Sequence, residues 1–291
     1  MYSKRKSYME PLTISLDEAY QYCENLTGKR ESNFSLGFKL LSPEKKRAIY
    51  VVYAACRFVD DLSDDQPERN NEDILLKWRG ELDNVYIHQA PQHPIGVALL
   101  DVLKTFEIPR EGIEELIQGC IQDQTIKRYQ TFEALSGYCD LVATSIAKVS
   151  LPIYRYTNYD QLFSHGRDLS FAFQLTNILR DVSEDFDGGR MYLPQDEIKR
   201  FDLSESALAR GSDPEKILKF YEFQTKRCFD YFDSGFKVLE WIEDDAKPCV
   251  RAMHRAYKTI LEKISKDPIK ALKQKTTLSS EEKRVIVEES L

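Results

Sequence analysis

Apolar residues recur at helical spacing along most of this chain. The segments KRAIYVVYAACRFV (residues 46–59) and HGRDLSFAFQLTNILRDV (residues 165–182) place them three and four residues apart, which is the period of one face of an α-helix. No run alternates between apolar and polar residues as a strand does. The 12 glycines and 11 prolines fall mostly at expected helix ends. The pattern predicts an all-α protein.

The sequence shows no sign of a boundary between domains. No repeat period and no low-complexity linker interrupts the 291 residues. We therefore expect one all-α domain over residues 1–291, built from many helices around a central cavity. About residues 1–15 and the charged tail 265–291 are expected to be loose, the tail as a loose helix or a disordered segment.

The first acidic motif, RFVDDLSDD (residues 57–65), follows one of the apolar segments. A helix turns about 100° per residue, so side chains four residues apart stack on one face. Asp61 and Asp65 then point toward the flank of the helix. The polar stripe that remains is formed by Tyr53, Arg57, Asp60 and Asp64.

The second acidic motif, RDVSEDFD (residues 180–187), repeats this design. Its helix also carries many apolar residues, which should bury most of its surface. A polar stripe on such a helix must face either solvent or a polar cavity. This stripe, at spacings of three, four and four residues, is formed by Gln174, Asn177, Asp181 and Asp185.

Stacked carboxylates destabilise a helix unless a cation joins them. Mg²⁺ is the usual solution, because it takes oxygen ligands from a few carboxylates and completes its shell with water and substrate phosphates. The sequence has no Glu-x-x-His pair for a di-iron site, no zinc spacing among its four histidines and no nucleotide P-loop. The alternative is a pair of solvated helix faces; the repetition of the motif favours Mg²⁺.

The composition limits the compartment and the partners. A net charge of −7 argues against nucleic acid and anionic membranes, and an anionic substrate would need local arginines or bound cations. Six scattered cysteines without a CxxC pair fit a reducing cytoplasm. No signal core follows the N-terminus, and AIYVVYAAC (residues 48–56) is too short to span a bilayer. We expect a cytoplasmic protein with at most peripheral membrane contact; its oligomeric state is not indicated.

Three stretches together resemble a known family. YAACRFVDDLSD (residues 53–64), RYQTFEALSGYC (128–139) and QLTNILRDVSEDFDGGRMYLP (174–194) are similar to the motifs of the squalene/phytoene synthases, which join two allylic prenyl diphosphates head to head. The likeness covers about residues 30–264. It implies an isoprenoid-synthase-type helical bundle, with two aspartate-bearing helices facing each other across the cavity.

The resemblance also implies roles for individual residues. Mg²⁺ would be held against a diphosphate by Asp60, Asp64, Asp181 and Asp185. Catalytic roles fall on Tyr53, Arg57, Tyr138 and Tyr257. Substrate contacts fall on Arg30, Gln174, Asn177, Arg180 and Arg190. Part of the aromatic complement, 16 Tyr and 15 Phe, would line the cavity for the prenyl chain and its cation.

The chain departs from the family where a second substrate would bind. Thr144 and Ala147 stand at two positions where the family carries glycine, and their side chains would narrow the cavity there. Asn33 replaces a serine, and Glu31 adds negative charge nearby. These departures predict that one C15 diphosphate ionises and water captures its cation, giving farnesol. In this interpretation the chain is most like the farnesyl diphosphate phosphatase branch found in bacilli.

Other activities remain open at this stage. The main alternative is head-to-head condensation of two farnesyl diphosphates to dehydrosqualene or squalene, or of C20 substrates to phytoene. Reduction to squalene is disfavoured because no dinucleotide-binding fingerprint is present. A terpene cyclase would share the acidic spacing, a nucleotide pyrophosphohydrolase would share acidic helices with Mg²⁺, and a helical scaffold would need no metal.

Overall fold

The computed structural model describes residues 14–28, 33–64 and 71–291, but not the side chains of residues 33, 62–64 and 71–74. Helices dominate this part of the chain, as the apolar spacing predicts. Within the described residues there is no β-strand, only two isolated bridges, Arg128 with Met191 and Tyr156 with Ile242. The all-α fold class is confirmed.

The first half of the chain forms short and medium helices. They are α1 (Leu16–Gly28), α2 (Asn33–Phe38), α3 (Pro43–Asp64), α4 (Asn71–Asp83), α5 (Pro94–Val102), α6 (Arg110–Thr125), α7 (Phe132–Cys139) and α8 (Ser145–Tyr154), with single π-helical turns η1 (Asn84–His88) and η2 (Asp140–Thr144).

The second half contains three helices of 20 residues or more, together with several short ones. Its elements are α9 (Tyr159–Asp187), α10 (Gln195–Arg200), α11 (Glu205–Arg210), α12 (Pro214–Gly235), α13 (Lys247–Lys266), α14 (Pro268–Lys273) and α15 (Ser280–Glu288), with 3₁₀ turns η3 (Phe236–Glu240) and η4 (Asp244–Ala246).

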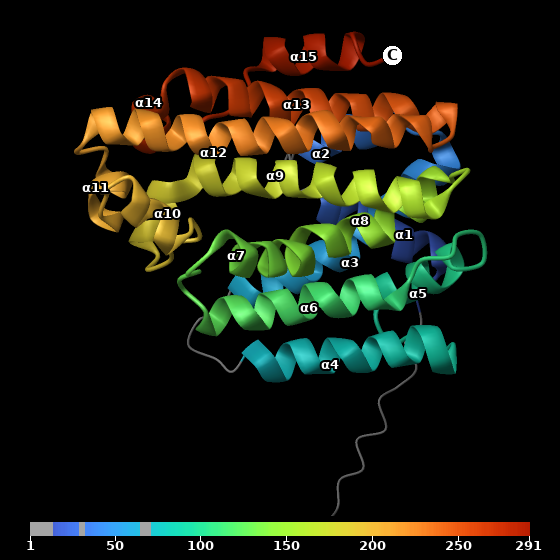
Figure 1. Cartoon of the computed structure of the whole chain (residues 1–291). Coiled ribbons are helices and arrows are strands. Elements are labelled where there is room, and N and C mark those ends of the chain that lie inside the picture. Colours follow the sequence, from blue (N-terminus) through green and yellow to red (C-terminus); the bar gives the residue numbers. More distant parts are fainter. Residues whose placement is uncertain (1–13, 29–32, 65–70) are drawn as a thin grey trace, which may run out of the picture.

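Helix α9 lies at the centre of the molecule, with α12 and α13 on one side and α8, α7 and α6 on the other (Figure 1). Its start is set by Asn158, whose side-chain oxygen accepts a hydrogen bond from the amide of Gln161 at 3.2 Å. Gly235, at the end of α12, allows the two helices to approach closely. A Cβ at this position would lie 2.6 Å from the backbone of Leu169. The second acidic motif is therefore carried by the most enclosed helix.

The C-terminal tail is ordered, contrary to the expectation of a loose segment. Pro268–Lys273 and Ser280–Glu288 form helices, and the second begins with a capping box between Ser279 and Glu282. Helix α15 packs on α13, where Ile286 is buried. Tertiary packing of these few apolar residues outweighs the high local charge. At the other end, residues 1–13 lie outside the described part of the chain.

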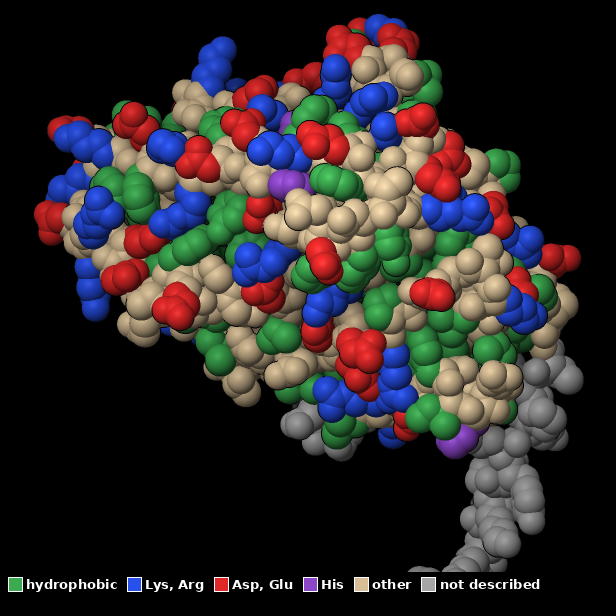
Figure 2. Space-filling view, turned by 45° about the vertical axis from the view of Figure 1, so that its right-hand side comes forward, with side chains coloured by type: hydrophobic (Ala, Val, Ile, Leu, Met, Phe, Trp, Pro, Cys, Tyr) green, Lys and Arg blue, Asp and Glu red, His purple; other side chains and the backbone are tan. Residues whose placement is uncertain are grey.

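The surface carries charged side chains of both signs, interspersed with hydrophobic ones on the face shown in Figure 2. Among the residues that the structure describes, no helix has the length and apolar character needed to cross a membrane. The six cysteines are all free and buried.

Candidate active site

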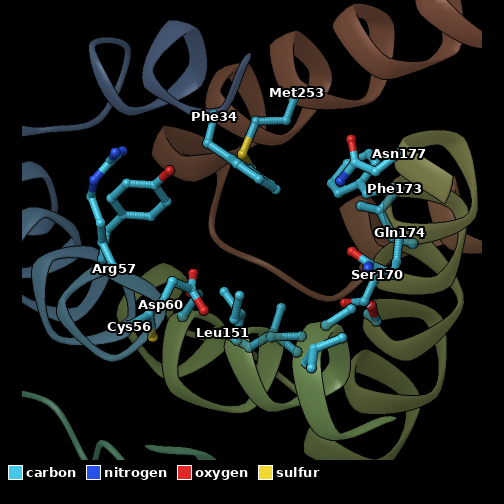
Figure 3. Close-up of a pocket in the computed structure, with 18 of the residues that line it drawn as sticks. Phe34, Cys56, Arg57, Asp60, Leu151, Ser170, Phe173, Gln174, Asn177 and Met253 are labelled. Atoms are coloured by element: carbon cyan, nitrogen blue, oxygen red, sulfur yellow. The ribbon is translucent and has the colours of Figure 1, made fainter. Parts of the chain in front are cut away.

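A cavity of about 440 Å³ lies between α3, α8, α9 and α13. Arg57 and Asp60 stand on one wall, and Gln174 and Asn177 stand on the opposite wall (Figure 3). Leu151 forms part of the floor between them. Parts of the two polar stripes predicted from the sequence therefore face each other across a shared space, whereas Asp181 and Asp185 are not among the residues that line it.

The first acidic motif presents its carboxylates at the polar end of this cavity. Asp60 is exposed and accepts a hydrogen bond from the thiol of Cys120, with Sγ and Oδ1 3.5 Å apart. Asp61 also lines the cavity, and its carboxylate lies 3.6 Å from Nε of Arg57. The expected separation of an inward Asp60 from a flanking Asp61 is thus not seen. Asp61 follows Asp60 by one residue near the end of α3, where both carboxylates reach the same opening.

The second acidic motif is more enclosed and is already paired with cations. The guanidinium of Arg180 donates to both oxygens of Asp181, at 2.9 and 2.5 Å. Nζ of Lys275 lies 3.4 Å from Oδ1 of Asp181 and 2.7 Å from the carboxylate of Glu184. The Asp181 side chain is only 18% exposed. Ion pairing, rather than solvent, balances this carboxylate.

Asp185, one turn further along α9, is strongly perturbed. Burial, followed by repulsion from Asp181, raises the pKa of its carboxyl to about 7, although Arg190 opposes the shift. A pair of carboxylates that destabilise each other's ionised form is a donor set that a divalent cation would relieve. The residues present therefore fit a hard cation such as Mg²⁺ in their oxygen chemistry.

Three of the four predicted metal ligands, Asp60, Asp181 and Asp185, have described side chains. Within the described residues, no three His, Cys, Asp or Glu side chains are grouped closely enough to hold a metal ion. The side chain of Asp64, one of the four predicted ligands, lies outside the described residues. The positions of Arg30 and Glu31, and the side chain of Asn33, lie outside them as well.

The remaining walls of the cavity are apolar. They come from six elements, α2, η2, α8, α9, η3 and α13, and the aromatic ring of Phe34 and the thioether of Met253 close the side opposite Leu151 (Figure 3). Other lining side chains are Phe38, Val142, Ile146, Leu169, Phe173, Val238 and Val250. A space with charged groups at one end and apolar groups along the rest suits a molecule with an anionic head and a long hydrocarbon chain.

Three of the predicted tyrosines lie at the site, in different settings. Tyr53 and Tyr138 line the cavity. Tyr257 is buried behind it, with its ring stacked on Phe173 at a centroid distance of 4.4 Å. Burial raises the pKa of Tyr257, while Arg180 opposes the shift. The phenol is therefore held neutral beside the second acidic motif.

Two residues of the site were missed by sequence reasoning. Asp123, on α6, lines the cavity next to Asp60, and its carboxylate lies 3.5 Å from Nε of Arg190. Lys275 reaches Asp181 from the tail that was expected to be loose. Asp123 has no second carboxylate four residues away in the sequence. Only the packing of α6 near α3 and α9 shows that it belongs to the site. No local signal marks Lys275.

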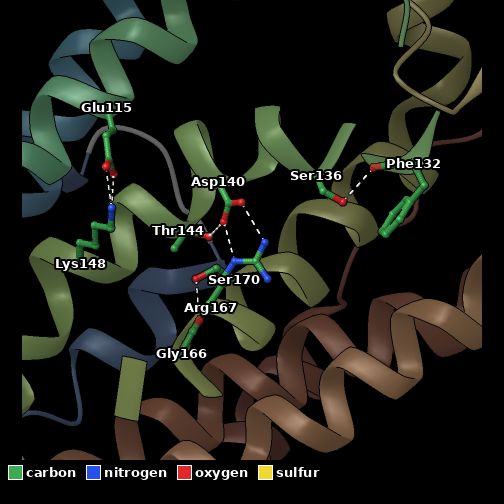
Figure 4. Close-up of polar contacts among 9 residues, drawn as sticks. All are labelled: Glu115, Phe132, Ser136, Asp140, Thr144, Lys148, Gly166, Arg167 and Ser170. Atoms are coloured by element: carbon green, nitrogen blue, oxygen red, sulfur yellow. Dashed lines mark hydrogen bonds and ion pairs between the residues drawn. The ribbon is translucent and has the colours of Figure 1, made fainter. Parts of the chain in front are cut away.

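The two substituted glycine positions behave differently from the expectation. Ala147 lines the cavity as predicted. Thr144 does not: it is 2% exposed, and its hydroxyl donates to Asp140 at 3.0 Å (Figure 4). Asp140 in turn accepts two hydrogen bonds from Arg167, at 2.7 and 2.8 Å. The π-helical turn η2 rotates Thr144 away from the cavity, so its side chain does not narrow the space for a second substrate.

Comparison with known proteins extends these observations. Residues 27–282 match the family model described as squalene/phytoene synthase. The 15-cis-phytoene synthase of Synechococcus elongatus is 33% identical, over 87% of this chain and 86% of that protein. The 15-cis-phytoene synthase of a Synechocystis species is also 33% identical, over 86% of this chain and 77% of that protein. A dehydrosqualene synthase crystal structure superposes with a TM-score of 0.86 at 25% identity, covering 94% of this chain and 96% of that one.

These comparisons correct the predicted activity. Hydrolysis of farnesyl diphosphate to farnesol, and with it the assignment as a phosphatase, is wrong: the curated relatives that match most of the chain are named phytoene synthases, which are transferases. The prediction rested on Thr144 and Ala147 together with Asn33 and Glu31, and the structure shows that Thr144 does not line the cavity. The alternative of head-to-head condensation is the one that the relatives support.

Proposed function

The chain belongs to the squalene/phytoene synthase family, and from that premise we propose that it joins two C20 prenyl diphosphates head to head to give phytoene. The observation that carries this proposal is the cavity itself. Two helices with acidic motifs face each other at its polar end, and an apolar space continues from it. The names of the relatives support C20 substrates in particular.

The polar end is suited to hold the diphosphate of an allylic substrate. We propose Mg²⁺ bound by Asp60, Asp64, Asp181 and Asp185; such an ion neutralises the leaving group as the C–O bond breaks. Arg57, only 13% exposed, lies beside these carboxylates and can contact the same phosphate oxygens. With the protein carrying a net charge of −7, this local positive charge is needed to attract an anionic substrate.

The apolar part of the cavity serves the carbocation that ionisation produces. The rings of Phe34, Phe173 and Tyr53 border the space, and aromatic faces stabilise a nearby cation without reacting with it. The apolar lining side chains, such as Phe38, Leu169 and Val250, carry no group that could attack the cation. The alkene of a second prenyl diphosphate is then the favoured nucleophile, and a new C–C bond forms.

Condensation of C15 substrates is the second candidate. The fold match to a dehydrosqualene synthase favours it, because that chain is covered almost completely. Both candidates use the same residues and differ only in the length of the chain accommodated.

One experiment tests both. Purified protein is incubated separately with geranylgeranyl and farnesyl diphosphate, with Mg²⁺ and with excess chelator, and the extracted products are analysed by gas chromatography. We expect a C40 hydrocarbon from the C20 substrate in the presence of Mg²⁺ only. A C30 hydrocarbon formed with the higher kcat/KM would favour the second candidate. Prenyl alcohol as the main product from both substrates would overturn condensation altogether.

We also propose that the protein works in the cytoplasm. Its six cysteines are free and buried, and a reducing compartment keeps thiols in that state. Fractionation of the source cells with an antibody against the chain would check this.

A further inference from the structure

Tyr154 is a residue of the cavity wall to which the proposed reaction gives no role. It is the last residue of α8, it lines the cavity, and it is buried. Val238 of η3 and Val250 of α13 also line the cavity and are buried. Because solvent hardly reaches these three side chains, they close the cavity on the side where they lie.

A contact with Lys45 shows that this side is remote from the first acidic motif. Lys45 belongs to the first turn of α3, and its Nζ donates to the carbonyl oxygen of Tyr154 at 3.2 Å. Asp60 lies near the other end of the same helix, about 22 Å further along the axis. Tyr154 therefore lies at the apolar end of the cavity, opposite to the polar end where Asp60 stands.

Lys45 holds the apolar end together from outside the cavity. Its side chain is only 3% exposed, and Nζ also pairs with Glu243 at 2.8 Å and with Asp245 at 2.5 Å. The segment that carries these carboxylates is attached to the chain after α8, where the amide of Thr157 donates to the carbonyl of Trp241 at 3.0 Å. A buried ammonium without partners is costly, so these contacts stabilise one another. The end of α8 is thus fixed relative to the start of α3.

The hydroxyl of Tyr154 does little to hold its ring in place. Within the part of the chain that the structure describes, its hydrogen-bond contact is with Sγ of Cys249, 3.8 Å away. A thiol is a weak donor and a weak acceptor. The ring is held by the packing around it and by the backbone that Lys45 anchors, and it occupies the end of the cavity by its bulk.

We infer that Tyr154, held in place by Lys45, closes the apolar end of the cavity and limits the length of the prenyl chain that the protein accepts. The inference rests on the proposed function. A substrate whose diphosphate is bound at the polar end must extend its hydrocarbon chain toward the apolar end. A chain longer than this space has to displace a ring that is packed in the core, and overfilling a packed core is unfavourable.

The main test compares Tyr154→Leu with Phe220→Leu in the full-length protein. Leucine lacks the far half of the aromatic ring. Phe220 is a matched control because it is buried on α12 and does not line the cavity. The measurement is kcat/KM for the C15, C20 and C25 prenyl diphosphates with Mg²⁺. In Tyr154→Leu, the ratio of kcat/KM for the next longer substrate to that for the preferred one should rise about tenfold. Phe220→Leu should leave this length ratio unchanged.

Two further variants of Tyr154 separate its bulk from its hydroxyl and from stability. Tyr154→Phe keeps the ring, so the length ratio should stay at the wild-type value. Tyr154→Met fills the core with a flexible side chain and gives the same test as leucine if the leucine variant does not fold.

A second pair of variants tests the contribution of Lys45. Lys45→Met keeps the length of the side chain without its charge, and should raise the length ratio by a smaller factor than Tyr154→Leu. Lys216→Met is the control. Lys216 also binds one carbonyl oxygen, that of Asp202 at 3.1 Å, and two carboxylates, those of Asp202 and Asp213 at 2.7 and 3.3 Å, but it does not line the cavity. This control should leave the length ratio unchanged.

Each outcome decides a separate part of the inference. An unchanged length ratio in Tyr154→Leu, or an equal rise in Tyr154→Phe, would show that the bulk of the ring does not set the limit. A rise in Tyr154→Leu with none in Lys45→Met would overturn the role of Lys45. A wild type that converts no prenyl diphosphate refutes the proposed function. The affinities of the same variants for saturated, unreactive C20 and C25 diphosphates, measured by isothermal titration calorimetry, would still judge the limit on chain length.

Discussion

The helices that carry the two acidic motifs line the same cavity, but the motifs hold their carboxylates in opposite ways. On α3, Asp60 is exposed, and Asp61 lies at a loose 3.6 Å from Arg57. On α9, Asp181 is largely enclosed, makes a close ion pair with Arg180 at 2.5 Å and has Nζ of Lys275 3.4 Å away. One wall presents negative charge to the opening, whereas the other has that charge already compensated by the protein.

This difference follows from where each motif lies in the fold. Both motifs lie at the C-terminal ends of their helices, but the second is on α9, which packs against α12, α13 and α14. Burying a carboxylate without a partner is costly, so an enclosed motif needs cations of its own. We infer that an incoming Mg²⁺–diphosphate complex approaches the first motif directly and displaces existing partners at the second.

The largest expected effect concerns the motifs themselves, which should be equally essential despite this difference. Asp60→Asn and Asp181→Asn should each lower kcat/KM by about a hundredfold or more, since each removes an oxygen donor for the metal. Asp233→Asn is the control, because this residue is exposed on α12 and pairs only at 3.3 Å with Lys258. A loss at one motif and none at the other would show that the second wall does not bind metal.

Much of this comparison could be predicted from the sequence, because the stripes follow from helical geometry alone. Spacings of three and four residues identified Gln174 and Asn177 as cavity-facing, and both line it. The contacts that depend on how the helices pack against one another could not be predicted from the sequence. The partner of Asp181 comes from a tail with no marked pattern, and Asp123 belongs to a third helix.

The sequence also did not predict the direction in which the side chain of Thr144 points. Thr144 was placed on the cavity side because it stands where the family carries glycine, but residues 140–144 form a π-helical turn. The extra residue in such a turn shifts every following side chain around the axis. An ideal rotation of about 100° per residue therefore assigns the wrong face there.

The second prediction tests the position of Asp61. Because it lines the cavity and pairs with Arg57, Asp61→Asn should lower kcat/KM by about tenfold, the cost of one weakened charge-assisted contact. The effect should lie between those of Asp60→Asn and Asp233→Asn, measured under identical Mg²⁺. Full activity would show that Asp61 lies on the flank of the helix, as a regular helical rotation predicts. A loss equal to that of Asp60→Asn would make Asp61 a metal ligand.

The third prediction concerns the enclosed wall without metal. The pKa of Asp185 is raised to about 7, chiefly by burial and then by Asp181, so in chelator the folded protein keeps this proton at pH values where the unfolded chain has lost it. The contribution to stability is complete below the ordinary pKa near 3.8 and is lost as pH rises toward 7. The unfolding free energy of Asp185→Asn minus that of the wild type should therefore be about 1 kcal/mol larger at pH 8 than at pH 5.

Urea denaturation at the two pH values measures this difference. Asp187→Asn provides a control that should show no change between the two pH values, because a hydrogen bond from Arg210 lowers the pKa of Asp187, so its carboxylate is ionised and its stabilising effect is present at both. A relative gain of the same sign in both variants would mean that general charge, rather than the crowding of Asp185 and Asp181, governs the pH dependence.

The smallest effect tests whether a protein cation competes with metal at the second motif. Nζ of Lys275 is 3.4 Å from Asp181, and the side chain is 52% exposed, so the pair is weak. Lys275→Gln removes the competing charge without removing an oxygen donor. We expect the Mg²⁺ concentration for half-maximal activity to fall about two- to threefold, a change within the range of exposed ion pairs. Lys226→Gln, which breaks an ion pair with Asp230 on the exposed face of α12, is the matched control. If Lys275→Gln instead requires more Mg²⁺, or lowers kcat, the lysine assists the diphosphate directly, and the enclosed motif does not release a partner when metal binds.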